Sequence, residues 1–73
     1  MAAVKFTCIT ESRASHEQIK NMTYLAGGAL IREKIYRDSA KGWEAEMEIV
    51  SEGGTLYRQV KELNLATKIN LVN

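Results

Sequence analysis

Three carboxylates are spaced along one segment of the chain in a way that could do chemistry. Residues 43–50 alternate apolar and acidic side chains, and the acidic ones are Glu44, Glu46 and Glu48. A β-strand repeats every two residues, so these three side chains share one face at intervals of about 6.6–6.8 Å. Such a row could imitate phosphates and engage an arginine-lined groove on a protein partner. The predicted partner-binding residues are this row and three residues at its rim: Glu44, Glu46, Glu48, Lys34, Tyr36 and Glu11.

The same row has a second interpretation, as a solvated sheet face that neutralises its own charge. If a hairpin is centred on Ala40, opposing residues have numbers that sum to 80, and basic residues then face the acidic row. Opposed ion pairs of this kind cancel much of the acidic field and contribute little stability. The pairs predicted by this register are Arg32–Glu48, Lys34–Glu46, Tyr36–Glu44, Ile31–Ile49, Ile35–Ala45 and Glu33–Met47.

Other chemistry is limited because the chain has one histidine and one cysteine. Cys8 alternates with polar neighbours in a predicted strand and is expected to be an inert core thiol. His16 is expected on the surface, in the first turn of a helix. One histidine and one cysteine cannot form a zinc site of the usual type. The sequence therefore predicts no metal, no cofactor and no enzymatic activity.

Two further side chains could be read as functional, and for each we favour a structural role. The register above places Glu33 on the covered face of the sheet, where a buried carboxylate would be costly. We expect it to bend out to water, because its strand lies at the sheet edge. Trp43 is expected to cover the core with its indole N–H at the rim, rather than to stack on a ligand.

The hydrophobic pattern predicts six elements in the order βαββαβ. Strands are expected at 4–10, 29–37, 43–50 and 65–72, and helices at 15–26 and 54–63, the first helix capped by Ser15 and Gln18. This order is typical of a ferredoxin-like α+β sandwich, with the first and third strands central and both helices on one face. If the segment around Leu56 were a strand, a β-meander would be the alternative. The expected core is Phe6, Ile19, Met22, Ile31, Ile35, Met47, Ile49, Leu56, Val60, Leu63 and Ile69.

Length and charge place the chain among small mixed-charge domains. Its 73 residues are predicted to form one domain, 1–73, and the formal net charge of +1 provides no general attraction to nucleic acid or membranes. We see no signal peptide and no apolar run of about 20 residues that could span a bilayer. A cytoplasmic location is expected.

Several families share this fold, and their signatures are missing here. Copper-chaperone-like domains carry two cysteines after the first strand, and acylphosphatase-like enzymes carry a glycine-rich loop there; residues 9–13 have neither. RNA-recognition domains present aromatic side chains on the two central strands, where this chain has the glutamates. Nucleic-acid binding is therefore disfavoured.

The remaining prediction is a non-enzymatic protein-interaction module, a regulator or inhibitor of a larger partner with a basic surface. Phage-encoded inhibitors of host defence, such as anti-CRISPR proteins, are one class of that kind. The alternative is an ACT-like regulatory domain that binds a small molecule as a dimer. Any homodimer is expected to form through the last strand, because residues 65–72 carry only one charge, Lys68.

Overall fold

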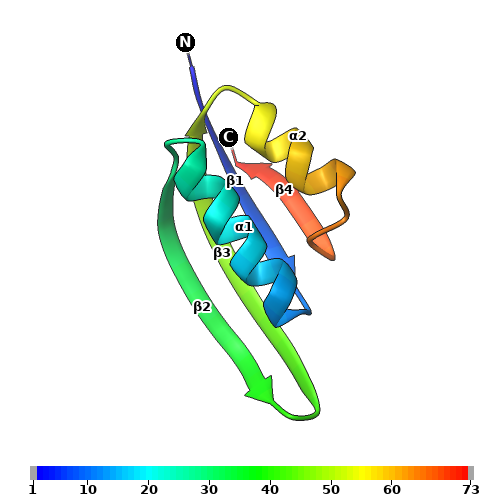
Figure 1. Cartoon of the computed structure of the whole chain (residues 1–73). Helices are drawn as coiled ribbons and strands as arrows, with labels where there is room; N and C mark the ends of the chain where they lie inside the picture. The colour runs from blue at the N-terminus through cyan, green and yellow to red at the C-terminus, as the bar shows by residue number, and fades with distance from the viewer. Residues whose placement is uncertain (1, 73) are drawn as a thin grey trace.

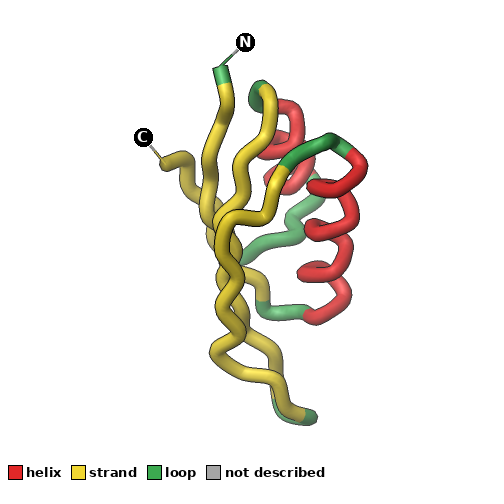
Figure 2. Tube along the Cα trace, turned by 90° about the vertical axis from the view of Figure 1, so that its left-hand side faces the viewer, coloured by secondary structure: helices red, strands yellow, loops and turns green. Residues whose placement is uncertain are grey.

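The computed structural model describes residues 2–72, which form one sheet and two helices (Figure 1). The sheet has four antiparallel strands in the order β2-β3-β1-β4, and both helices lie on the same side of it (Figure 2). The elements are β1 (Ala3–Thr10), α1 (Arg13–Leu25), β2 (Ala29–Ser39), β3 (Gly42–Glu52), α2 (Thr55–Glu62) and β4 (Lys68–Val72). This arrangement confirms the predicted α+β ferredoxin-like sandwich, with β1 and β3 central.

The first helix begins two residues earlier than predicted, at Arg13. Its N-cap is Ser12, whose hydroxyl accepts a hydrogen bond from the Ser15 backbone N–H at 3.3 Å. The predicted cap at Ser15 is therefore wrong by three residues. The helix ends where expected, because Gly27 adopts φ +72°, a conformation that favours glycine. Asn64 ends α2 in the same left-handed region, at φ 54°.

Two β-bulges modify the predicted register between β2 and β3. Four of the predicted pairs are confirmed: Arg32–Glu48, Lys34–Glu46, Ile35–Ala45 and Glu33–Met47. The bulges lie between Leu30 and Arg32 and between Ile35 and Arg37. Each inserts one unpaired residue into β2, so the chain shifts by one position beyond it. The two predicted pairs Ile31–Ile49 and Tyr36–Glu44 are wrong, because Ile49 pairs with Leu30 and Glu44 pairs with Arg37.

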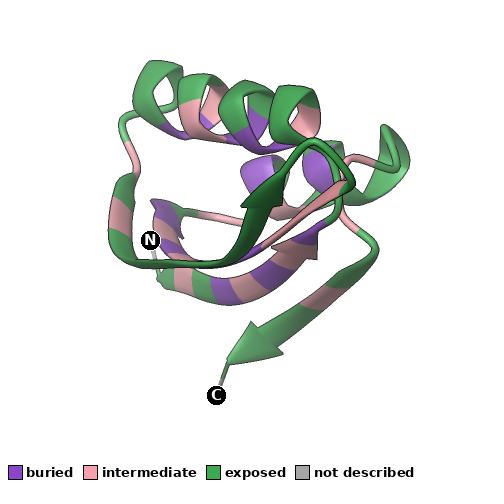
Figure 3. Ribbon diagram, turned by 90° about the horizontal axis from the view of Figure 1, so that it is seen from below, coloured by how far each residue is buried: buried purple, intermediate pink, exposed green. Residues whose placement is uncertain are grey.

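The core lies between the helices and the two central strands (Figure 3). Its buried members are Phe6, Cys8, Ile19, Met47, Ile49, Leu56 and Val60, with Met22 and Ile69 partly buried against them. Three predicted core residues are wrong, since Ile31, Ile35 and Leu63 are about half exposed. Ile31 is displaced by the first bulge, and Leu63 follows the end of α2. Ile35 lies beside the start of α1, where it lines a hollow instead of packing in the core.

The β2–β3 hairpin extends beyond the helical layer, which gives the molecule its length of 42 Å against 20 and 18 Å in the other directions (Figure 1). The side of the sheet away from the helices, here called the open face, is covered by no other described element (Figure 2). Among residues 2–72, neither helix has the length and apolar character needed to cross a membrane.

Candidate functional site

Two of the predicted partner-binding carboxylates lie at the middle of the open face and are held by neighbouring side chains. Glu46 accepts hydrogen bonds from the Tyr36 hydroxyl at 2.9 Å and from Arg32 Nη1 at 3.3 Å. Glu48 accepts one from Arg32 Nε at 3.4 Å and lies 4.0 Å from Lys5 Nζ on β1. One guanidinium therefore bridges two carboxylates and fixes the spacing of the row.

These contacts change the acid–base properties of the groups involved. The Tyr36 hydroxyl, more than Arg32 or Lys34, lowers the pKa of the Glu46 carboxyl. The hydrogen bonds to Glu48 and Glu46 raise the pKa of Arg32, and the bond to Glu46 raises the pKa of Tyr36. Lys34 Nζ lies 5.2 Å from the centre of the Tyr36 ring. Glu46 is thus ionised near neutral pH and lies among cations.

The third carboxylate, Glu44, lies at the hairpin end of the row and is its most exposed member, with 42% of its side chain accessible. Its partner is Arg37, at 3.7 Å. Glu44, Arg37, Glu11 and Trp43 line a polar hollow of about 190 Å³. The structure therefore brings Lys34, Tyr36 and the three row carboxylates together on the open face, with Glu11 in the loop after β1 at the hollow beside Glu44, and it places a matching cation beside each of the three row carboxylates.

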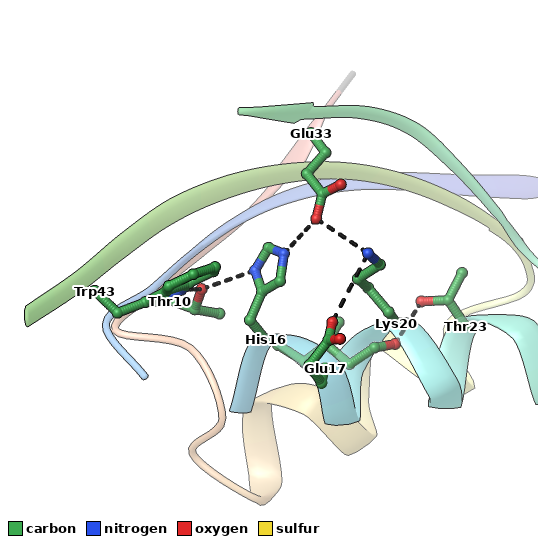
Figure 4. Close-up of polar contacts among 8 residues, drawn as sticks. Thr10, His16, Glu17, Lys20, Thr23, Glu33 and Trp43 are labelled. Atoms are coloured by element: carbon green, nitrogen blue, oxygen red, sulfur yellow. Dashed lines mark hydrogen bonds and ion pairs between the residues drawn. The ribbon is translucent and has the colours of Figure 1, made fainter. Parts of the chain in front are cut away.

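A second polar cluster lies on the opposite side of the sheet, between α1 and the hairpin (Figure 4). Its centre is His16, which is only 1% exposed, so the prediction of a surface histidine is wrong. Nδ1 of His16 lies 3.1 Å from the Thr10 hydroxyl, and Nε2 contacts the Glu33 carboxylate. The Trp43 indole N–H donates to the same hydroxyl at 3.3 Å. We refer to Thr10, His16, Glu33 and Trp43 as the His16 cluster.

Glu33 keeps access to water, as predicted, with 27% of its side chain exposed, but it does not bend away from the covered face. It reaches from β2 back to α1, where its Oε2 contacts His16 and lies 3.4 Å from Lys20 Nζ (Figure 4). The hydrogen bond with His16 is the largest influence and lowers the pKa of the Glu33 carboxyl, although partial burial opposes it. Glu17 completes the chain of contacts, 3.7 Å from Lys20. The cost of partly burying the Glu33 carboxylate is thus offset by its contacts with His16 and Lys20.

The hydrogen-bond partners indicate where the protons of the cluster lie. The ionised Glu33 carboxylate only accepts, so Nε2–H of His16 donates to it, whereas the Thr10 hydroxyl accepts from the Trp43 N–H and shares a hydrogen bond with Nδ1 of His16 whose direction depends on the imidazole tautomer. A hydroxyl, an imidazole and a carboxylate in this order resemble the relay of a hydrolytic triad. Thr10 is completely buried, however, and its hydroxyl is covered by Trp43. No reacting carbonyl could reach that oxygen, so the cluster acts as a structural tie between α1, β1 and the hairpin.

The Trp43 ring is enclosed on two sides, which differs from the predicted lid at the rim of the core. Its edge packs against His16 with ring centres 5.2 Å apart, and the Arg13 guanidinium lies 5.7 Å from the ring centre. The indole N–H points inward to Thr10. A hollow of about 170 Å³ lies beside it, lined by Arg13, His16, Glu17, Lys20, Glu33, Ile35 and Trp43.

Cys8 lies in the core, as predicted, and burial raises the pKa of its thiol to about 11. The thiol is therefore protonated near neutral pH and a poor nucleophile. Within residues 2–72, no three histidine, cysteine or acidic side chains are grouped so that they could hold a metal ion.

One signal in the sequence could have located the His16 cluster. The predicted register already placed Glu33 on the covered face, opposite Met47, and the structure confirms that pairing. A carboxylate on a covered face needs a cationic or N–H partner. His16 and Lys20 are four residues apart, so they share one side of the predicted helix.

Comparison with known proteins supports the fold and leaves the function open. No protein-family model matches the sequence, and no curated protein is similar to it. A solved structure described as GqqA, a novel type of quorum quenching acylase, aligns with 94% of this chain at a TM-score of 0.59 and 12% sequence identity. The chain spans only 27% of that protein's length. At this identity the likeness shows a shared arrangement of strands and helices.

Proposed function

We propose that this chain is a non-enzymatic interaction module, a regulator or inhibitor that binds a larger protein through the hairpin end of its open face. The observation that carries the proposal is the row Glu44, Glu46 and Glu48, which lies on a face that neither helix covers. Arg32 and Tyr36 hold two of the three carboxylates at defined positions. Groups that are already ordered lose little conformational entropy on binding, which favours affinity.

The charge pattern restricts the kind of surface that would fit. Rows of opposite sign alternate across the sheet: the cations of β2, the carboxylates of β3, and Lys5 on β1. A partner with basic side chains opposite the carboxylates, flanked by acidic ones, would be complementary, whereas a uniformly basic surface would meet repulsion from β2. This alternation favours a protein partner over the uniform charge of a phosphate backbone.

The hollow lined by Glu11 and Glu44 is the most suitable binding site for one basic side chain of the partner. Both carboxylates line it, and the Arg37 pair that now occupies its rim is long, at 3.7 Å, and solvent-exposed. An exposed pair of this kind contributes little stability and is readily replaced. A partner arginine in this hollow would also lie beside Trp43, which lines it.

A charge-reversal experiment tests this proposal. The wild-type chain and a double variant, Glu11→Lys with Glu44→Lys, are used to capture proteins from a cell extract at low and high salt. We expect a partner that wild type retains, that the double variant loses, and whose capture weakens as salt rises. The matched control is Glu17→Lys with Glu62→Lys, which makes the same charge change on the helical side.

The control separates a local contact from a general charge effect. Equal loss of the partner in both double variants would contradict binding at the open face, as would full retention by Glu11→Lys with Glu44→Lys. Circular dichroism of each variant verifies that the fold is intact before capture is compared.

A second candidate is an ACT-like regulatory domain that binds a small molecule. What favours it is the fold, which occurs in GqqA as 27% of a longer chain, and the hollow of about 170 Å³ beside His16. Trp43 is the only tryptophan and lines that hollow, so its fluorescence reports directly on occupancy. Titration with amino acids and nucleotides that left the emission of Trp43 unchanged would count against this candidate.

A further inference from the structure

The two edges of the sheet differ in their ability to pair with a second copy of this chain. An edge strand exposes unpaired backbone N–H and C=O groups, and charged side chains are the usual protection against pairing. The edge strand β2 is long and charged, whereas the edge strand β4 has five residues and a single charge, Lys68.

On β2, symmetric pairing brings like charges together. In an antiparallel pair related by a two-fold axis, the residue on the axis faces its own copy. An axis at Arg32, Glu33 or Lys34 therefore opposes two identical charges, which is destabilising. The two bulges in β2 also interrupt the regular ladder that a partner strand requires. This edge is protected against self-association.

On β4, symmetric pairing brings compatible side chains together. An axis at Asn70 is the one register that opposes all five residues of the strand. Ile69 then faces Leu71 of the second copy, on the helix-covered side, and Lys68 faces Val72. Leu71 is paired with the buried Phe6, yet it remains 53% exposed, since no residue lies beyond it at the edge. A second copy would cover this apolar surface.

We propose that β4 is a homodimerisation edge, paired antiparallel with β4 of a second copy about a two-fold axis at Asn70. The two sheets then form one continuous eight-stranded sheet with all helices on one side, because residues 68 and 72 share a face. The open-face row on β3 is separated from β4 by β1 and stays accessible. This inference is independent of the function proposed above, which concerns the opposite end of the sheet.

The position on the axis provides a register-specific test. Asn70 is exposed, so substitution there should leave the monomer folded. Sedimentation velocity is measured from about 10 μM to about 1 mM, since pairing of two short strands is a small interface and is expected to be weak. Asn70→Lys and Asn70→Glu should each raise the Kd of the dimer by about tenfold, because each places identical charges opposite one another. An equimolar mixture of the two should restore dimers, now as heterodimers.

Every outcome of this experiment decides for or against the proposal. Ile31→Lys on the β2 edge is the matched control, since Ile31 is similarly exposed, and it should leave the dimer unchanged. A monomer at all concentrations, or loss of association in Ile31→Lys alone, overturns the proposal. Stronger association of Asn70→Glu would place Asn70 opposite Lys68 and overturn the register. Circular dichroism verifies that each variant is folded.

Discussion

The two polar clusters of this protein each contain a partly exposed carboxylate, but one carboxylate contacts a buried partner and the other an exposed one. In the His16 cluster, the Glu33 carboxylate contacts an imidazole and lies near a lysine, and the histidine side chain is only 2% exposed. On the open face, the Glu46 carboxylate contacts a guanidinium and a phenol, and the guanidinium side chain is 48% exposed. Glu33 and Glu46 are themselves similarly accessible, at 27% and 23% of the side chain, so the difference lies in the partner: water screens the exposed guanidinium and does not reach the buried imidazole. We therefore expect the His16 cluster to determine stability and the open face to determine recognition.

The largest expected effect is that of removing His16. His16→Ala leaves a cavity beside Trp43 and deprives Thr10 and Glu33 of their partner, which should lower the free energy of unfolding by roughly 2–4 kcal/mol. Urea denaturation followed by circular dichroism measures it. Gln18→Ala, on the exposed side of the same helix, is the control. A loss in His16→Ala no larger than in this control would show that the cluster contributes little.

Neutralising Glu33 should have a smaller effect. Glu33→Gln retains an acceptor for the His16 N–H but removes the charge that both His16 and Lys20 contact, so a loss of about 1–2 kcal/mol is expected. Glu17→Gln is the control, since it also removes one negative charge beside Lys20, but from an exposed side chain. It should change the free energy of unfolding by less than about 0.5 kcal/mol. Equal losses of stability in Glu33→Gln and Glu17→Gln would contradict a special role for the contact between Glu33 and the buried His16.

The pH dependence of stability sharpens the comparison further. The pKa of Glu33 is lower in the folded protein than the ordinary value of about 4.3. The ionised carboxylate therefore stabilises the folded state fully above that pH, and this stabilisation disappears as the pH falls through the lower pKa of the folded protein. The stability difference between wild type and Glu33→Gln should therefore shrink on acidification below about pH 4.3. Urea midpoints at several pH values measure it, and a difference that persisted at the lowest pH would show that ionisation of Glu33 is not its source.

The smallest expected change in stability is that of neutralising a carboxylate on the open face. Glu46→Gln should alter the free energy of unfolding by less than about 0.5 kcal/mol, because the Arg32 contact is exposed and the amide still accepts from Tyr36. If the same variant weakened capture of the partner, recognition and stability would be separated as proposed. A loss as large as that of His16→Ala would instead make the open face a stability element.

Periodicity in the sequence was enough to predict the element order and most of the hairpin register. Alternation along 43–50 identified β3 and its two faces, and the pairs Arg32–Glu48 and Lys34–Glu46 followed from the turn at Ala40. What the same reasoning missed was local irregularity. The bulges of β2 moved Ile31 to the surface and exchanged Arg37 for Tyr36 opposite Glu44, and hydropathy patterns carry no signal for an inserted residue.

The sequence by itself determined the fold class, the inert buried thiol of Cys8 and the face on which the glutamate row lies, because each depends on short-range spacing or on composition. Tertiary structure alone decided that His16 is buried and that Glu33 is its partner. These residues are 17 positions apart, and their contact depends on how α1 is placed over β2. Whether a polar side chain is exposed or paired is a property of the neighbours that folding brings to it, and those neighbours lie on other elements.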